Sequence, residues 1–161
     1  MKVLEKAKAL TMSLHGFVGY IEPSTGYLHS PTLSREMWDK CQVSERTVVF
    51  EEFTGLWGWV LTHRTPLLTN TAREDARSST TPEGHIPIER FLSVPAMVGD
   101  SLVGQIALAN SEEDYTPEDQ YIVEQLASLF ALAIERKRGE EEIRQAREAL
   151  ETRVQERTAE L

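Results

Sequence analysis

Residues 91–110, FLSVPAMVGDSLVGQIALAN, contain the pattern that decides the fold. Two mostly apolar runs flank the pair Gly99-Asp100, which favours a tight turn. In the second run Val103, Gln105, Ala107 and Ala109 alternate with Leu102, Gly104, Ile106 and Leu108. Alternation with a period of two is typical of a β-strand. We therefore predict a β-hairpin whose first strand includes residues 91–96.

A stiff loop, TPEGHIPIER at residues 81–90, leads into this hairpin. Two prolines restrict its backbone and a glycine allows it to turn. A loop that is shaped in advance loses less entropy when it covers a ligand. We expect His85 either to contact a ligand or to bond to the loop backbone. Arg90 is expected either to meet an anionic group or to pair with the acidic surface.

The rest of the body predicts a mixed α+β domain. Residues 16–33 contain two short alternating runs around Pro23-Ser24-Thr25-Gly26, which is typical of a hairpin. A short helix is predicted within residues 34–43. Residues 54–63 have helical spacing and are followed by a short strand at residues 67–68.

The C-terminal part predicts one long helix. Thr116 is placed to cap its start and Pro117 takes the first helical position. The a and d sites of one heptad register hold Ile122, Leu126, Leu129, Ala133, Ile143, Leu150, Val154 and Leu161. Four charged residues interrupt this seam, which indicates a weak coiled coil that depends on dimerisation of the domain beneath it. The alternative is a solvated single helix, and Gly139 is its weak point.

Composition limits the classes of function. The 161 residues carry a net charge of -9, which argues against nucleic-acid binding because phosphate contacts need a basic surface. No apolar run approaches the roughly 20 residues of a membrane span, and the N-terminus lacks the apolar core of a signal peptide. The single cysteine, Cys41, excludes an internal disulfide framework and a multi-cysteine metal site. We expect a cytoplasmic protein with no membrane contact by this segment.

The chain divides near Glu135. From that residue onward there are 8 acidic and 7 basic residues and no proline or aromatic residue, whereas the body is acidic. A nearly balanced charge pattern of this kind is typical of an exposed helix. We predict a folded domain at residues 1–135 and a coiled-coil linker at residues 136–161.

The order of these elements resembles the GAF domain family. The resemblance rests on HGFVGYIEPSTGYLHSP, GLWGWVLTHRTPLLTN, FLSVPAMVGDSLVGQIALAN and YTPEDQYIVEQLASLFALAIE, which together cover most of residues 1–137. It implies a PAS-related α+β fold with a central antiparallel sheet of about six strands. Helices would pack on one face, and the other face would hold a small-molecule pocket covered by the loop at residues 70–90. The tail resembles the linkers that follow such sensors in histidine kinases.

Several activities of the GAF family do not match this sequence. Asn110, Tyr115 and Asp119 roughly fit the pattern of cyclic-nucleotide binders, but Ser111 replaces its lysine. Bilin attachment uses a cysteine in a Cys-His context, which is absent here because glutamine follows the cysteine. Sulfoxide reduction in this family needs more than one cysteine. Nucleophile-elbow, zinc-protease and P-loop motifs are also absent, so we expect no catalysis.

The ligand and cofactor remain open at this point. Haem would need an axial His or Cys, and the candidates are His15, His29, His63, His85 and Cys41. Large aromatic residues can stack on a flat ligand or simply fill the core. The candidate pocket and lid residues are Tyr20, Trp38, Cys41, Trp57, His85, Pro87, Arg90, Phe91 and Ser93.

The sequence thus predicts a sensory domain that binds an unknown small molecule. The signal would pass through a dimeric C-terminal coiled coil to an output domain outside this chain, with a histidine kinase as the expected output. One alternative is a dimerisation or protein-interaction module without a ligand. Another is a haem or redox sensor that uses Cys41 or His85.

Overall fold

A computed structural model describes residues 2–32, 48–78 and 85–159 of the chain. Its elements in chain order are α1 (Lys2–Thr11), β1 (Ser13–Ile21), β2 (Leu28–His29), β3 (Val49–Phe50), α3 (Gly55–His63), β4 (Leu67–Thr69), β5 (Phe91–Val98), β6 (Ser101–Ser111) and α4 (Pro117–Ala159). The short helix predicted within residues 34–43 lies outside the described residues.

The six strands form one antiparallel sheet in the order β3-β2-β1-β6-β5-β4. The hairpin predicted at residues 91–110 is confirmed, with Gly99 at its turn in the left-handed region at a φ of 56°. The hairpin between β1 and β2 is confirmed as well. Strands β1, β6 and β5 make the long pairings, so they form the centre of the sheet.

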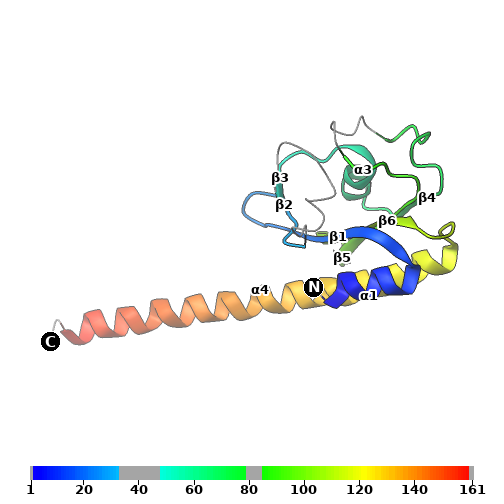
Figure 1. Cartoon of the computed structure of the whole chain (residues 1–161). Helices are drawn as coiled ribbons and strands as arrows, with labels where there is room; N and C mark the ends of the chain where they lie inside the picture. The colour runs from blue at the N-terminus through cyan, green and yellow to red at the C-terminus, as the bar shows by residue number, and fades with distance from the viewer. Residues whose placement is uncertain (1, 33–47, 79–84, 160–161) are drawn as a thin grey trace.

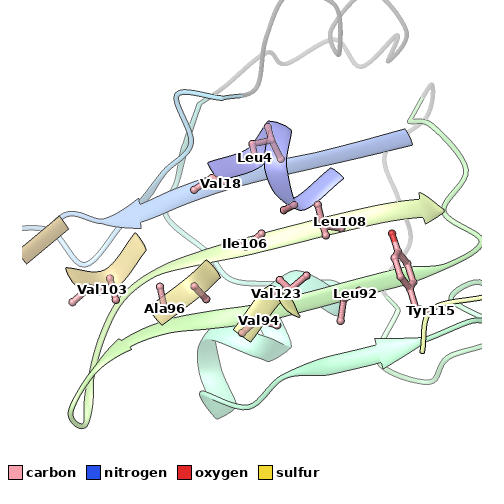
Figure 2. Close-up of a cluster of buried hydrophobic side chains, with 13 residues drawn as sticks. Leu4, Val18, Leu92, Val94, Ala96, Val103, Ile106, Leu108, Tyr115 and Val123 are labelled. Atoms are coloured by element: carbon pink, nitrogen blue, oxygen red, sulfur yellow. The ribbon is translucent and has the colours of Figure 1, made fainter. Parts of the chain in front are cut away.

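Helices α1 and α4 lie together along one face of the sheet, and α3 lies on the other face (Figure 1). Alternate residues of a strand share one face of the sheet. On the central strands one such set is apolar, and it packs against α4. Figure 2 shows this core, which includes Leu92 and Val94 of β5, Ile106 and Leu108 of β6, and Val123 of α4. A second buried cluster packs α3 against the opposite face.

The sequence predictions did not include helix α1. It buries Leu4 and Ala7 against the sheet beside α4. Its last residue, Thr11, is 2.6 Å from the hydroxyl of Ser13, which is 2.7 Å from the hydroxyl of Tyr115. Burial raises the pKa of Tyr115 to about 12, so this phenol stays protonated and able to donate. The hydroxyl chain joins the end of α1, the start of β1 and the segment before α4.

Helix α4 begins as predicted. The Thr116 hydroxyl accepts a hydrogen bond from the Asp119 backbone N–H at 3.2 Å, and the Asp119 carboxylate accepts from the Thr116 N–H at 2.8 Å. This reciprocal pair is a capping box with an aspartate in the place of glutamate. The helix then runs without interruption through Gly139, and every described residue beyond that glycine is exposed.

Candidate functional site

The sheet face beneath α3 carries the residues that could bind a small molecule. On β5 and β6 this face holds Phe91, Ser93, Ala107 and Ala109, since alternate strand residues share a face. Helix α3 covers part of the face with Leu56 and Val60. The resulting layer is apolar apart from three buried polar side chains, those of Ser93, Gln105 and Thr69.

An aromatic cluster closes one side of this layer. The indole ring of Trp57 on α3 makes edge contacts with three phenylalanines, at centroid distances of 6.4 Å to Phe17, 5.3 Å to Phe50 and 6.0 Å to Phe53. Edge-to-face packing of this kind adds stability beyond the buried area. The cluster joins β1, β3 and the segment that enters α3.

The polar group at the centre is the side chain of Gln105 on β6, which is fully buried. Its Nε2 donates to the backbone oxygen of Trp57 at 2.9 Å and to the hydroxyl of Ser93 at 2.7 Å. Its Oε1 has no hydrogen-bond donor within reach. The prediction of ligand-binding residues missed Gln105. The sequence feature that could have identified it is a glutamine that shares a strand face with two alanines in an otherwise apolar strand.

Asn110 pins the loop that leads into β5. Its backbone is in the left-handed region with a φ of 56°. Its Oδ1 accepts from the backbone N–H of Glu89 at 2.8 Å, and its Nδ2 donates to the backbone oxygen of Pro87 at 2.8 Å. Asparagine tolerates this conformation better than most residues. Both polar groups of the Asn110 side chain therefore bind the loop backbone.

The loop residues expected to contact a ligand have partners within the protein. The Nδ1 atom of His85 is 2.7 Å from the backbone oxygen of Ile86, which agrees with the expected bond to the loop backbone. Arg90 pairs with the exposed Asp114 at 2.8 Å, which agrees with the expected pairing to the acidic surface. Both side chains lie at the edge of the sheet face and remain accessible.

The structure brings together only part of the predicted pocket. Trp57, Phe91 and Ser93 lie on the α3 face. Tyr20 stacks on His29 with ring centroids 5.3 Å apart, and it lies on the opposite face with Val18, because alternate strand residues share a face. Trp38 and Cys41, also predicted for the pocket, lie outside the described residues.

Trp59 on α3 is partly buried and packs against the same apolar cluster. Its ring stacks on His63 at 4.3 Å, and the guanidinium of Arg77 lies 4.9 Å from its centroid. Three hydrogen bonds join Arg77 to Asp75, two from the guanidinium and one from the backbone N–H, and they hold the pKa of this carboxyl at about 2. His63 also lies 2.9 Å from the backbone oxygen of Trp59 in the last turn of the helix, as expected for a histidine near a helix C-terminus.

A groove of about 310 Å³ lies where α4 leaves the domain. It is lined by Ile21, Pro23, Val98, Ser101, Leu102, Val103, Glu135 and Arg138. Arg138 crosses from the helix to donate to the backbone oxygen of Ile21, and it also donates to Glu135 at 3.0 Å. This contact joins the helix to the end of β1, and the sequence predictions did not include it.

The described residues include no group of three or more His, Cys, Asp or Glu side chains that could hold a metal ion. The described histidines considered for haem belong to separate elements, with His15 on β1, His29 on β2, His63 on α3 and His85 in the loop before β5. Among the described helices, none is long and apolar enough to cross a membrane.

Comparisons with known proteins agree with the fold. A sensor associated with a methyl sulfide methyltransferase in Methanosarcina acetivorans is 26% identical over 142 residues, which are 87% of this chain and 14% of that protein. The chain thus spans a small part of that relative. The GAF domain of an Acinetobacter phosphoenolpyruvate-protein phosphotransferase superposes with a TM-score of 0.67 at 16% identity, over 84% of this chain and 80% of that one.

The GAF domain of a two-component sensor histidine kinase from Bacillus halodurans superposes with a TM-score of 0.57 at 15% identity, over 85% of this chain and 94% of that one. At these identities the two structures support the fold alone. The model of the GAF domain family matches residues 2–135, a range that includes the sheet, helices α1 and α3 and the first part of α4. The chain therefore belongs to the GAF domain family.

Proposed function

We propose that this chain is a sensory domain that binds a small molecule on the α3 face of its sheet and passes the signal through α4. The observation that carries the proposal is the continuity of α4. One helix contributes Val123, Ala127 and Ala131 to the buried core and then extends as an exposed helix to residue 159. A shift of the sheet is therefore transmitted directly to the exposed part.

Arg138 gives this transmission a fixed point. It lies on the last turn of α4 that contacts the domain, and its bond to Ile21 joins the helix to the strand next to β6. A ligand can change the position of the helix only if it binds two arrangements with different affinity. The β1 end and the β5–β6 turn, which line the groove beside Arg138, are the elements through which such a difference would reach α4.

The exposed apolar seam of α4 supports a parallel homodimer. Leu129, Ile143, Leu150 and Val154 are between 56% and 72% exposed, although all four are large apolar side chains. Exposed apolar side chains that recur along one side of a helix are typical of a surface that packs against a partner helix. Arg136 and Glu140, which pair with each other, occupy seam sites and interrupt the apolar surface, whereas pairs such as Arg144–Glu148 support the helix outside the a and d sites.

The proposed output is a histidine kinase or a related signalling domain outside this chain. It draws on the likeness to a sensor of Methanosarcina acetivorans and to the GAF domain of a sensor histidine kinase. The competing class is a dimerisation module whose α3 face holds no ligand. The two classes differ in whether the purified protein binds a small molecule.

Sedimentation equilibrium tests the dimer. We expect the wild-type chain to be a dimer at micromolar concentration and the double variant Ile143→Glu/Leu150→Glu to be a monomer, because two carboxylates enter the seam in each chain. Ala149→Glu adds charge to the same turn outside the a and d sites and should remain dimeric. A wild-type monomer at 100 micromolar would refute the dimer.

Native mass spectrometry tests ligand binding. We expect wild-type protein purified without refolding to carry a small-molecule mass, and the melting temperature to fall when that molecule is removed. Protein that carries no added mass and shows no thermal shift with any class of metabolite would instead support the dimerisation module.

A further inference from the structure

The groove where α4 leaves the domain has the dimensions of a small-molecule site. Its volume of about 310 Å³ lies at the lower end of the range for ligand pockets in proteins, which is roughly 300 to 1,000 Å³. The end of β1, the β5–β6 hairpin and one side of α4 build it. A groove of this size suits a small metabolite.

Most of the lining is apolar, and part of it is accessible. Ile21 and Pro23 come from the end of β1 and the turn after it, and Val98, Leu102 and Val103 come from the β5–β6 hairpin. Of these, Ile21, Val98 and Leu102 are only partly buried, so they leave apolar surface in contact with water. Removing such surface from water is favourable. The groove therefore favours a ligand with a hydrocarbon part.

Two side chains of opposite charge, Glu135 and Arg138 of α4, line the same groove. The guanidinium donates to Glu135 Oε1 at 3.0 Å and to the backbone oxygen of Ile21. A guanidinium has five N–H donors and a carboxylate has two acceptor oxygens. Among the described residues, the other N–H donors of Arg138 and the Oε2 atom of Glu135 therefore have no partner. The side chains are 25% and 44% exposed, so a molecule from solvent can reach both charges.

We propose that this groove binds an apolar α-amino acid. Its carboxylate accepts hydrogen bonds from Arg138, its ammonium group donates to Glu135, and its hydrocarbon side chain covers the apolar lining. A molecule with both charges fits better than one with a single charge, because a lone carboxylate would face Glu135 and a lone ammonium group would face Arg138. This site is separate from the α3 face, and the inference does not depend on binding there.

The proposed dimer leaves this groove open. With about 3.6 residues per turn, Glu135 and Arg138 lie on nearly the opposite side of α4 from the seam residues Leu129 and Ala133. The bound amino acid contacts α4, the end of β1 and the β5–β6 hairpin together. It therefore strengthens the connection that Arg138 makes between the helix and the sheet.

Three probes with the same hydrocarbon part separate the two charges. L-leucine carries both, isopentylamine lacks the carboxylate, and 4-methylpentanoate lacks the ammonium group. We expect isothermal titration of the wild-type chain to give about tenfold tighter binding for L-leucine than for either analogue, which is the ratio expected from one charge-assisted hydrogen bond.

Two variants remove one charge each. In Arg138→Met the guanidinium is lost, so L-leucine should bind no more tightly than isopentylamine. In Glu135→Gln the carboxylate is lost, so L-leucine should bind no more tightly than 4-methylpentanoate but should keep its advantage over isopentylamine. Glu135 is exposed, so this second variant provides the test even if Arg138→Met does not fold.

Glu142→Gln is the matched control. Glu142 is exposed, lies one heptad beyond Glu135 on the same side of α4 and does not line the groove, so its replacement should leave all three affinities unchanged. Circular dichroism and thermal melting establish that each variant is folded.

Nuclear magnetic resonance locates the binding. On titration with L-leucine the backbone amide signals of Ser101 and Leu102 should move, and the indole N–H signal of Trp57 should stay in place. Movement of the Trp57 signal instead, equal affinity for the three probes, or no movement of the groove signals at about 10 millimolar L-leucine overturns this inference and leaves the α3-face proposal standing. If L-leucine binds in the groove and the purified protein carries no molecule on the α3 face, the α3-face proposal alone fails.

Discussion

Replacing Asn110 tests whether its side chain holds the loop before β5. The Asn110→Ala variant loses the bonds to the Glu89 N–H and to the Pro87 oxygen, each 2.8 Å long. Each contributes about 0.5 to 1.5 kcal/mol, with the lower part of that range expected at an exposed site. Alanine also lacks the tolerance of asparagine for a φ of 56°, which adds roughly 1 kcal/mol. We expect a total loss of about 2 to 3 kcal/mol.

Urea denaturation and thermal melting measure this loss. A destabilisation of that size lowers the melting temperature by roughly 4 to 12 °C in a chain of this length. Asn110→Gly is the matched control, because glycine adopts the positive φ without strain but makes neither side-chain bond. We therefore expect the order of stability to be wild type, then Asn110→Gly, then Asn110→Ala.

Hydrogen exchange locates the effect. The backbone N–H of Glu89 should exchange faster in both variants, because it loses its acceptor, while the N–H of Leu92 within β5 should keep its protection. An Asn110→Ala protein within 0.5 kcal/mol of the wild type, or an Asn110→Gly protein less stable than Asn110→Ala, would refute the proposed role.

Two further predictions concern a glycine and an ion pair. Gly58→Ala should destabilise the domain by several kcal/mol, since a Cβ atom would lie 2.3 Å from the backbone carbon of Phe53. In Gly139→Ala the added Cβ meets no atom within 4 Å, so this variant should stabilise α4 by about 1 kcal/mol. Similar urea midpoints for the two variants would contradict this prediction. The Arg77 guanidinium lowers the pKa of Asp75 from 3.8 to about 2. The stability that ionised Asp75 contributes is therefore complete above pH 4 and is lost as the pH falls from about 4 to 2, so the difference between wild type and Asp75→Asn should shrink over that window and stay constant from pH 5 to 7. A difference independent of pH in urea titrations would count against the pair.

The sequence predicted the elements whose signal is local. The hairpin at residues 91–110 followed from a turn pair between alternating runs, and the start of α4 followed from a cap, a proline and an acidic first turn. These patterns depend on residues a few positions apart, so they can be identified without knowledge of the fold. Helix α1 was missed because a helix of 10 residues is marginal by itself and forms here by packing on the sheet.

The candidate site could be predicted only in part. Trp57, Phe91 and Ser93 lie on the α3 face, but strand alternation places Tyr20 on the opposite face. Asn110 was considered for its place in a nucleotide-binding pattern, and its hydrogen bonds are instead committed to the loop. The direction of a strand side chain depends on the register, and a shift of one residue reverses it.

By itself, the sequence determined the α+β class, the central hairpin and the long helix with its apolar seam, because periodicity and turn chemistry act between near neighbours. Only the tertiary structure decided what the polar side chains do. The amide of Gln105 donates to the backbone oxygen of Trp57, 48 positions away, and Arg138 donates to the backbone oxygen of Ile21, 117 positions away. Such contacts depend on how distant segments pack. The same packing decides how far a hydrogen bond is buried, and therefore how strong it is.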